Sequence, residues 1–303
     1  MSEDLDALWA RVWPAPAKLN LFLHVVGRRD DGYHLLQSAF RLVDLVDSLR
    51  FVRRHDDRIA MAVALEGVPE ASDLCVRAAR LLQTAAAARG SDVCGVTIHL
   101  DKRIPMGGGL GGGSSDAATV LMALNRLWRL GMSAAQLQAL GLGLGADVPF
   151  FLSGGNAFAE GVGEVLTPLT LPPAWYLILV PPVQVPTATV FTASELTRNT
   201  KSVKISSFSG VSSGVSSRAA GGRLGVDFGH NDLQSVVYAK YAEVARCLDW
   251  LARHGSARMS GSGACVFAQF DTRGEADAVS AKLPADMRGM VVEGLQRHPV
   301  DAG

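Results

Sequence analysis

The sequence has no excess of charge of either sign. Its 303 residues include 29 Lys and Arg and 29 Asp and Glu, so the formal net charge at pH 7 is zero. Proteins that bind nucleic acids through their overall charge need a surplus of Lys and Arg on one face. The charge balance therefore counts against a nucleic-acid partner.

Cysteines and long apolar runs are also scarce. The four cysteines form no C-x-x-C pair, which is typical of reduced thiols rather than of a disulfide framework or a metal site. No apolar run approaches the roughly 18 residues of a membrane span, and the first residues lack the apolar core of a signal peptide. We therefore expect a cytoplasmic protein with no membrane partner.

Glycine, in contrast, is concentrated in one place. Residues 103–118 read RIPMGGGLGGGSSDAA, with six glycines among the seven positions 107–113. Such a cluster marks backbone that adopts positive φ or that a ligand approaches closely. The residues SSD at 114–116 can cap a helix predicted from the apolar spacing over 117–128. Free N–H groups at the start of that helix favour an anion, so we predict a phosphate loop.

This loop differs from two common phosphate motifs. Residues 107–112 match G-x-G-x-x-G, but Pro105 and Met106 separate them from the preceding strand, and no acidic residue occurs between Asp116 and Asp147. The Gly-Lys-Ser/Thr of a Walker loop is also missing. A dinucleotide-dependent oxidoreductase therefore remains only as a weak alternative.

Candidate site residues occur on a strand and a turn near the N-terminus. The odd-numbered residues from 17 to 25 are apolar, which predicts a half-buried strand with Lys18 and Asn20 on its other face. These two residues lie roughly 6.5 Å apart along such a strand. The turn DDG then leads to Tyr33 and His34, which on their own could equally be packing residues.

Asp147 is the candidate carboxylate. It lies in the segment LGADVPFF, where Lys18 is the obvious cation to pair with it, but it could instead cap a short helix at DVPFF. Asp116 is also ambiguous, because an acidic side chain in the first turn of a helix would repel phosphate unless Mg²⁺ lay between them.

Strands and helices intermix along the chain, which predicts the α+β class with a domain boundary between residues 155 and 175. Ser72 is expected to cap a helix over 72–90, residues 230–232 to cap one long helix ending at Gly255, and SGSG at 260–263 to form a turn leading into a strand. The Ser/Gly-rich segment 200–225 is predicted to be a flexible loop.

Five segments, in this order, resemble those of the GHMP kinases: PAKLNL, GYH, PMGGGLGGGSSDAA, GADVPFF and MSGSGACVF. The match runs from Pro14 to about Phe270. The resemblance implies a two-domain kinase with the site between its domains. The ATP-binding N-terminal domain (1–165) would be like ribosomal protein S5 domain 2, and the C-terminal domain (166–303) would be ferredoxin-like.

The resemblance also implies ATP and Mg²⁺ as cofactors and a small-molecule substrate. It is strongest to the members that phosphorylate the 2-hydroxyl of cytidine diphosphate methylerythritol in non-mevalonate isoprenoid biosynthesis. Homoserine, mevalonate or sugar kinases are alternatives within the family, and a nucleotide-binding regulator or an RNA-binding module lies outside it. We expect a monomer or a weak homodimer.

The family's roles map onto matching positions of this chain. The resemblance assigns catalysis to Lys18 and Asp147 and assigns no metal ligand. ATP would bind at Pro105, Met106, Gly107, Gly108, Gly109, Leu110, Gly111, Gly112, Gly113, Ser114 and Ser115. The substrate would bind at Asn20, Tyr33, His34, Asp147, Thr187 and Phe191, with Tyr33 and Phe191 stacking on the two faces of the base.

Overall fold

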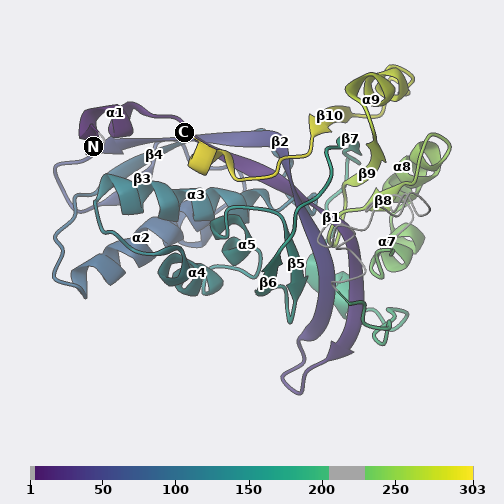
Figure 1. Ribbon diagram of the computed structural model, residues 1–303, viewed down its shortest axis with the longest axis horizontal. Helices are drawn as coiled ribbons and strands as arrows, with labels where there is room; N and C mark the ends of the chain where they lie inside the picture. The colour runs from purple at the N-terminus through teal and green to yellow at the C-terminus, as the bar shows by residue number, and fades with distance from the viewer. Residues whose placement is uncertain (1–3, 205–228, 303) are drawn as a thin grey trace, which may run out of the picture.

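The computed structural model describes residues 4–204 and 229–302 and contains two β-sheets (Figure 1). The first sheet has six strands in the order β3-β4-β2-β5-β6, with β1 paired to β2 off this path. Its strands are β1 (Trp13–Arg28), β2 (His34–Arg53), β3 (Ile59–Met61), β4 (Val96–Asp101), β5 (Ala157–Glu160) and β6 (Val165–Pro168).

The second sheet is antiparallel throughout and has the order β10-β7-β9-β8. Its strands are β7 (Trp175–Leu179), β8 (Arg258–Met259), β9 (Val266–Phe270) and β10 (Gly289–Glu293). The apolar run beginning at Trp175 forms a central strand, as its composition predicts. If its strands are numbered 1 to 4 in chain order, the spatial order in this sheet is 4-1-3-2. This is the ferredoxin-like arrangement that was expected.

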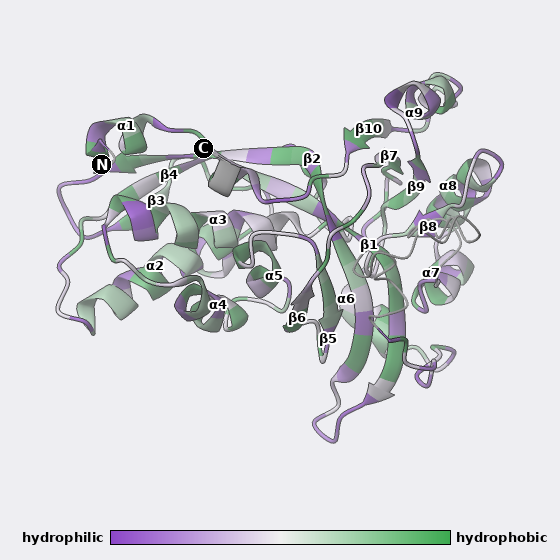
Figure 2. Ribbon diagram, viewed as in Figure 1, coloured by the Kyte–Doolittle hydropathy of each residue, from purple (hydrophilic) through white to green (hydrophobic). Residues whose placement is uncertain are grey.

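The long hairpin β1–β2 extends from the helix-covered part of the first sheet to the second sheet (Figure 1). Hydrophobic residues run along much of both strands, whereas the loop at the hairpin tip is hydrophilic (Figure 2). The prediction that β1 is half-buried is wrong. Lys18, Asn20, Phe22 and His24 are as buried as the apolar face, because other parts of the fold cover both sides of the strand.

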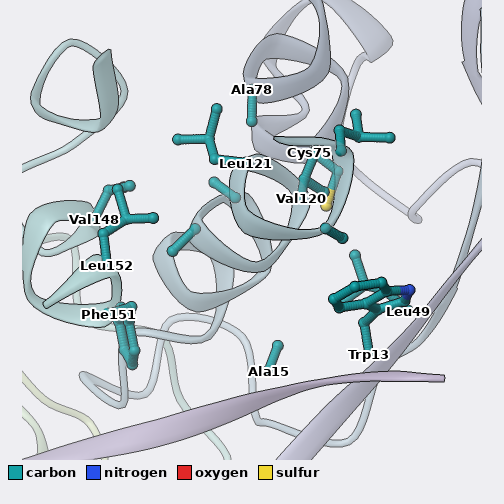
Figure 3. Close-up of a cluster of buried hydrophobic side chains, with 14 of the residues drawn as sticks. Trp13, Ala15, Leu49, Cys75, Ala78, Val120, Leu121, Val148, Phe151 and Leu152 are labelled. Atoms are coloured by element: carbon teal, nitrogen blue, oxygen red, sulfur yellow. The ribbon is translucent and has the colours of Figure 1, made fainter. Parts of the chain in front are cut away.

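Helices on one face of the first sheet form the main core (Figure 3). Trp13 and Leu49 from the strands lie on the side of Cys75 of α2 and Val120 of α3, and Phe151 of α5 belongs to the same cluster. The helices of this part are α1 (Leu5–Ala10), α2 (Leu74–Ala87), α3 (Gly112–Leu127), α4 (Ala134–Leu142) and α5 (Val148–Leu152), with the 3₁₀ turn η1 (Glu70–Ser72) before α2.

Two expected helix starts differ in the structure. Asp73, not Ser72, caps α2, because the Asp73 carboxylate accepts hydrogen bonds from the backbone N–H groups of Cys75 and Val76. Gly111 is the N-cap residue of α3 at a φ of 72°, so residues 114–116 lie inside the helix rather than before it. The left-handed glycine ends the loop directly at the helix.

The second sheet carries α7 (Gln234–Lys240), α8 (Ala242–Ala252) and α9 (Arg273–Ser280), and α6 (Thr187–Phe191) lies near the hairpin. The expected single helix from residue 230 to Gly255 is therefore wrong. The backbone is extended at Tyr241 (φ −127°, ψ 98°), which separates α7 from α8. Residues 230–232 also do not cap α7, whose N-cap is Leu233 without a side-chain hydrogen bond.

The C-terminal segment returns to the first sheet. Leu295 N–H donates to Leu42 O at 2.8 Å, and Val300 in the turn η3 (Pro299–Ala302) is part of the main core. Within the described residues, no helix combines the length and apolarity that crossing a bilayer requires.

The predicted flexible loop at 200–225 is ordered at its beginning. Thr200 N–H donates to Val25 O at 3.1 Å, and the backbone of Val203 exchanges two hydrogen bonds with the side chain of Gln37. The rest of that predicted loop, from residue 205, lies outside the described residues.

Candidate active site

A cavity of about 910 Å³ lies where β1, the glycine loop, the start of α5 and α6 meet. It brings together every side chain predicted for catalysis or substrate binding, although these come from distant parts of the sequence. They are Lys18, Asn20, Tyr33, His34, Asp147, Thr187 and Phe191.

Lys18 and Asp147 form an ion pair at this cavity. Lys18 Nζ lies 3.4 Å from Asp147 Oδ2, and the lysine side chain is 4% exposed whereas the aspartate side chain is 33% exposed. Asp147 occupies the N-cap position of α5, but its side chain makes no capping hydrogen bond. The structure thus answers the open alternative: the carboxylate faces Lys18 and the cavity rather than the helix.

Asn20 holds the ammonium group of Lys18 in place. Lys18 Nζ donates to Asn20 Oδ1 at 2.5 Å, and Asn20 Nδ2 donates to Ser38 Oγ at 2.9 Å. Ser38 Oγ in turn donates to the backbone oxygen of Phe22 at 2.6 Å. These hydrogen bonds fix the Asn20 amide with its oxygen toward Lys18. Both the oxygen and the nitrogen of this predicted substrate-binding side chain therefore already have protein partners.

The glycine loop presents bare backbone to the cavity. Gly107, Gly109 and Gly111 line it with φ values of 69°, 73° and 72°. A Cβ on Gly111 would lie 3.0 Å from Phe151 Cζ and 3.1 Å from Lys18 Cγ. The loop is therefore closely packed on one side and open to a ligand on the other.

The turn at residues 260–265 supports the loop from behind. Ser260 Oγ donates to Gly109 O at 2.9 Å, and Cys265 N–H donates to Gly108 O at 3.0 Å. A Cβ on Gly109 would lie 2.1 Å from Ser260 O, so the glycine is needed for this close approach. The sequence predicted only that SGSG forms a turn leading into a strand. It did not predict that this turn supports the glycine loop, although MSGSGACVF is among the family segments.

Not every predicted loop residue reaches the cavity. Ser114 lines it, and the hydroxyl of buried Ser115 has no hydrogen-bond partner in the described chain. Leu110 belongs to the hydrophobic core. Pro105, Met106, Gly108, Gly112 and Gly113 are also absent from the cavity lining.

Asp116 is held away from the cavity by Lys102. Asp116 Oδ2 lies 2.6 Å from Lys102 Nζ, and Lys102 also pairs with the buried carboxylate of Asp47. Burial raises the pKa of Asp116 to about 7, although the lysine works in the opposite direction. The cation beside Asp116 is therefore a side chain of the protein, and Asp116 does not line the cavity.

The other end of the cavity contains the predicted residues His34 and Phe191, together with an arginine that was not predicted from the sequence. The rings of His34 and Phe191 lie 5.1 Å apart, and Arg198 Nε donates to His34 Nε2 at 3.1 Å. Burial, then the charges of Arg198 and Arg28, lower the pKa of His34. Tyr33 is 63% exposed at the rim. The only available signal for Arg198 was the segment ELTRNT shortly after Phe191.

The described residues contain no group of three or more His, Cys, Asp or Glu side chains that could hold a metal ion. The cavity does offer the oxygen atoms of Asp147 and Ser114. Mg²⁺ at phosphate-transfer sites is commonly held by one or two carboxylates together with substrate phosphates and water. The donor set therefore fits an ion that arrives with a nucleotide.

Comparison with known proteins gives consistent results. The family models for the GHMP kinases N terminal domain and the GHMP kinases C terminal match residues 73–155 and 217–289. The 4-diphosphocytidyl-2-C-methyl-D-erythritol kinase of Thiobacillus denitrificans is 58% identical over 96% of this chain and 98% of its own length.

Solved structures agree with this assignment. A crystal structure of 4-(cytidine 5'-diphospho)-2C-methyl-D-erythritol kinase is 34% identical with a TM-score of 0.78, covering 94% of this chain and 99% of that one. A mevalonate kinase structure, at 14% identity and a TM-score of 0.68 over 94% of this chain and 99% of that one, shares the fold. The chain belongs to the GHMP kinase family and, within it, to the 4-diphosphocytidyl-2-C-methyl-D-erythritol kinases.

Proposed function

We propose that the protein transfers the γ-phosphoryl group of ATP to the 2-hydroxyl of 4-diphosphocytidyl-2-C-methyl-D-erythritol in non-mevalonate isoprenoid biosynthesis. The observation that carries this proposal is the Lys18–Asp147 pair in one cavity with both the glycine loop and the His34–Phe191 pair. The curated relatives with this activity match nearly the whole chain.

The glycine loop binds the phosphates of ATP. Bare backbone at Gly107, Gly109 and Gly111 lets phosphate oxygens approach N–H groups, and the positive end of the α3 dipole adds to the attraction. The turn at 260–265 keeps the loop rigid, so the protein's dipoles are already oriented when charge develops.

Asp147 accepts the proton of the substrate hydroxyl. The resulting oxygen attacks the γ-phosphorus in line, the bond from that phosphorus to the β–γ bridging oxygen breaks, and ADP leaves. Lys18 lies between Asn20 and Asp147, where its ammonium group orients the carboxylate and offsets negative charge. Mg²⁺ bound to the phosphates, within reach of Asp147 or Ser114, would supply further charge neutralisation.

The cytidine end of the substrate binds between Tyr33 and Phe191. Base–aromatic stacking contributes about 1 to 3 kcal/mol per base. His34 lies against Phe191, within reach of the base edge. Thr187, whose hydroxyl is 2.8 Å from that of Ser262, completes this side of the cavity.

The domain division, cellular location and oligomeric state that the resemblance implies are also part of the proposal. We place the division between an N-terminal domain (1–165) and a C-terminal domain (166–303) near β6, with the catalytic pair in the first domain and Phe191 in the second. A cytoplasmic enzyme that is a monomer or a weak homodimer fits this arrangement.

Release of ADP in the presence of the cytidine diphosphate acceptor, mevalonate or homoserine tests the proposed function. We expect ATP consumption with the cytidine compound alone. Preference for mevalonate or homoserine would instead place the protein among the other GHMP kinases.

A further inference from the structure

We propose that Arg198 determines which pyrimidine the acceptor site takes, by fixing the tautomer of His34 so that its Nδ1 carries a proton. This inference rests on the proposed function, because it concerns the base of the cytidine diphosphate acceptor. Arg198 is a positioning residue: it acts on the ligand through His34.

Arg198 is held firmly by the backbone around α6. Its Nη2 donates to Phe191 O at 3.1 Å and to Ala193 O at 2.6 Å, and its Nη1 donates to Leu196 O at 3.1 Å. These bonds leave Nε to donate to His34 Nε2 at 3.1 Å. The guanidinium group therefore links the segment that carries Phe191 to the start of β2.

The chemistry of this contact dictates the protonation of His34. A guanidinium group only donates hydrogen bonds, so the nitrogen that faces it must present a lone pair. A neutral imidazole has one N–H group, which must then be on Nδ1. Two cations, Arg198 and Arg28, face His34 and favour the neutral ring, in agreement with its lowered pKa.

An N–H donor at Nδ1 distinguishes cytosine from uracil. The N3 atom of cytosine is an acceptor, whereas N3 of uracil carries a hydrogen and is a donor. His34 lines the cavity beside Phe191, and within the described chain no residue hydrogen-bonds its Nδ1. A uracil base would place two donors opposite each other, so neither would have an acceptor, which reduces affinity on the order of tenfold or more.

The tautomer can be measured without any substrate. Nitrogen-15 NMR of the histidine-labelled wild-type protein, with the His34 signal assigned from its loss in His34→Gln, is expected to show protonated Nδ1 and unprotonated Nε2 at neutral pH. Protonated Nε2 would overturn the proposal. This measurement is independent of the acceptor and therefore separates a failure of this inference from a failure of the proposed function.

Kinetics then test the consequence for specificity. Arg198→Gln replaces a group that only donates with one that donates or accepts, so it frees the tautomer. Cytidine preference is measured as kcat/KM for the cytidine acceptor divided by kcat/KM for its uridine analogue. We expect this ratio to fall about tenfold, because KM for the acceptor changes. The KM for ATP should be unchanged. Arg198→Lys keeps a donor-only cation and should restore part of this ratio.

Arg28→Gln is the matched control. It removes the other cation facing His34, while the hydrogen bond from Arg198 stays in place. We expect the Nδ1 tautomer and the cytidine-to-uridine ratio to stay as in the wild type. An equal loss of activity on both nucleotides in Arg198→Gln would indicate a merely structural role and overturn the proposal, and so would an unchanged ratio.

Discussion

The buried ammonium group of Lys18 needs oxygen partners, because an unpaired charge inside a protein is costly. Asn20 and Asp147 supply these partners from two different elements. The asparagine is fixed by Ser38, whereas the aspartate is partly exposed to the cavity. This difference leaves Asp147 as the member of the group that can exchange a proton with a ligand.

Replacing Asp147 with Asn tests the role of the base. We expect Asp147→Asn to lower kcat by at least about 10²-fold, because general-base catalysis typically contributes 10²- to 10⁴-fold. Binding of ATP, measured by calorimetry, should be unchanged, since the glycine loop is intact. Near-normal turnover in this variant would refute the assignment.

Tyr33 tests which end of the cavity holds the base. Tyr33→Ala should raise KM for the cytidine acceptor roughly 5- to 150-fold, the equivalent of about 1 to 3 kcal/mol of stacking, with little change in KM for ATP. The side chain is largely exposed, so the protein should remain folded. The reverse kinetic pattern would mean that the two nucleotide positions are exchanged.

At the scale of elements, the glycine loop and the 260–265 turn form one unit. Three contacts from the turn reach consecutive loop carbonyls, at Gly107, Gly108 and Gly109. The loop conformation therefore depends on a segment about 150 residues later in the chain. A sequence motif for phosphate binding contains no information about this support.

Gly109→Ala tests the close approach. Its added Cβ would overlap Ser260 O and displace the loop, so we expect kcat/KM for ATP to fall on the order of 10²-fold. Gly131→Ala is the matched control: its φ of 61° is also positive, but no atom lies within 4 Å of the added Cβ. That variant should lose only about 1 kcal/mol of stability from backbone strain and retain its kinetics. Equal kinetic effects in both variants would contradict this explanation.

At the scale of the whole molecule, the C-terminal segment ties the end of the chain to the first sheet. His298 is fully buried there, and its Nδ1 accepts a hydrogen bond from Val300 N–H at 3.3 Å. Burial lowers the pKa of His298 to about 3. The ring is thus neutral in the folded protein and protonates near its ordinary pKa of 6.5 in the unfolded chain.

This difference predicts a loss of stability in acid. The pKa of His298 is lower in the folded protein than in the unfolded chain. Its contribution to the free energy of unfolding is therefore complete above pH 6.5 and is lost as pH falls toward 3, by about 1.4 kcal/mol per pH unit. The free energy of unfolding, measured with urea, should decrease from pH 7 to pH 5.5. This decrease should be about 1 kcal/mol larger in the wild type than in His298→Gln. His55→Gln, at an exposed histidine, should keep the wild-type decrease. Equal decreases in wild type and His298→Gln would rule out this contribution.

Whole-molecule packing also explains which predictions about elements were wrong. The alternation in β1 indicated one polar face, but packing in the complete fold buries that face together with Lys18 and Asn20. Helical spacing after residue 230 continued through Tyr241, yet the structure has two helices there. Local periodicity reports which residues are apolar, and tertiary packing decides how many sides of an element are covered.

The sequence by itself determined the local features of this protein: the bare glycine loop before a helix, the strand that places Lys18 and Asn20 on one face, and the turn before Tyr33. These depend on backbone freedom and on side-chain periodicity, which neighbouring residues set. Only the tertiary structure decided that Ser260 supports the loop and that Arg198 faces His34. Such contacts join segments far apart in the chain, and their geometry exists only after the two sheets have packed.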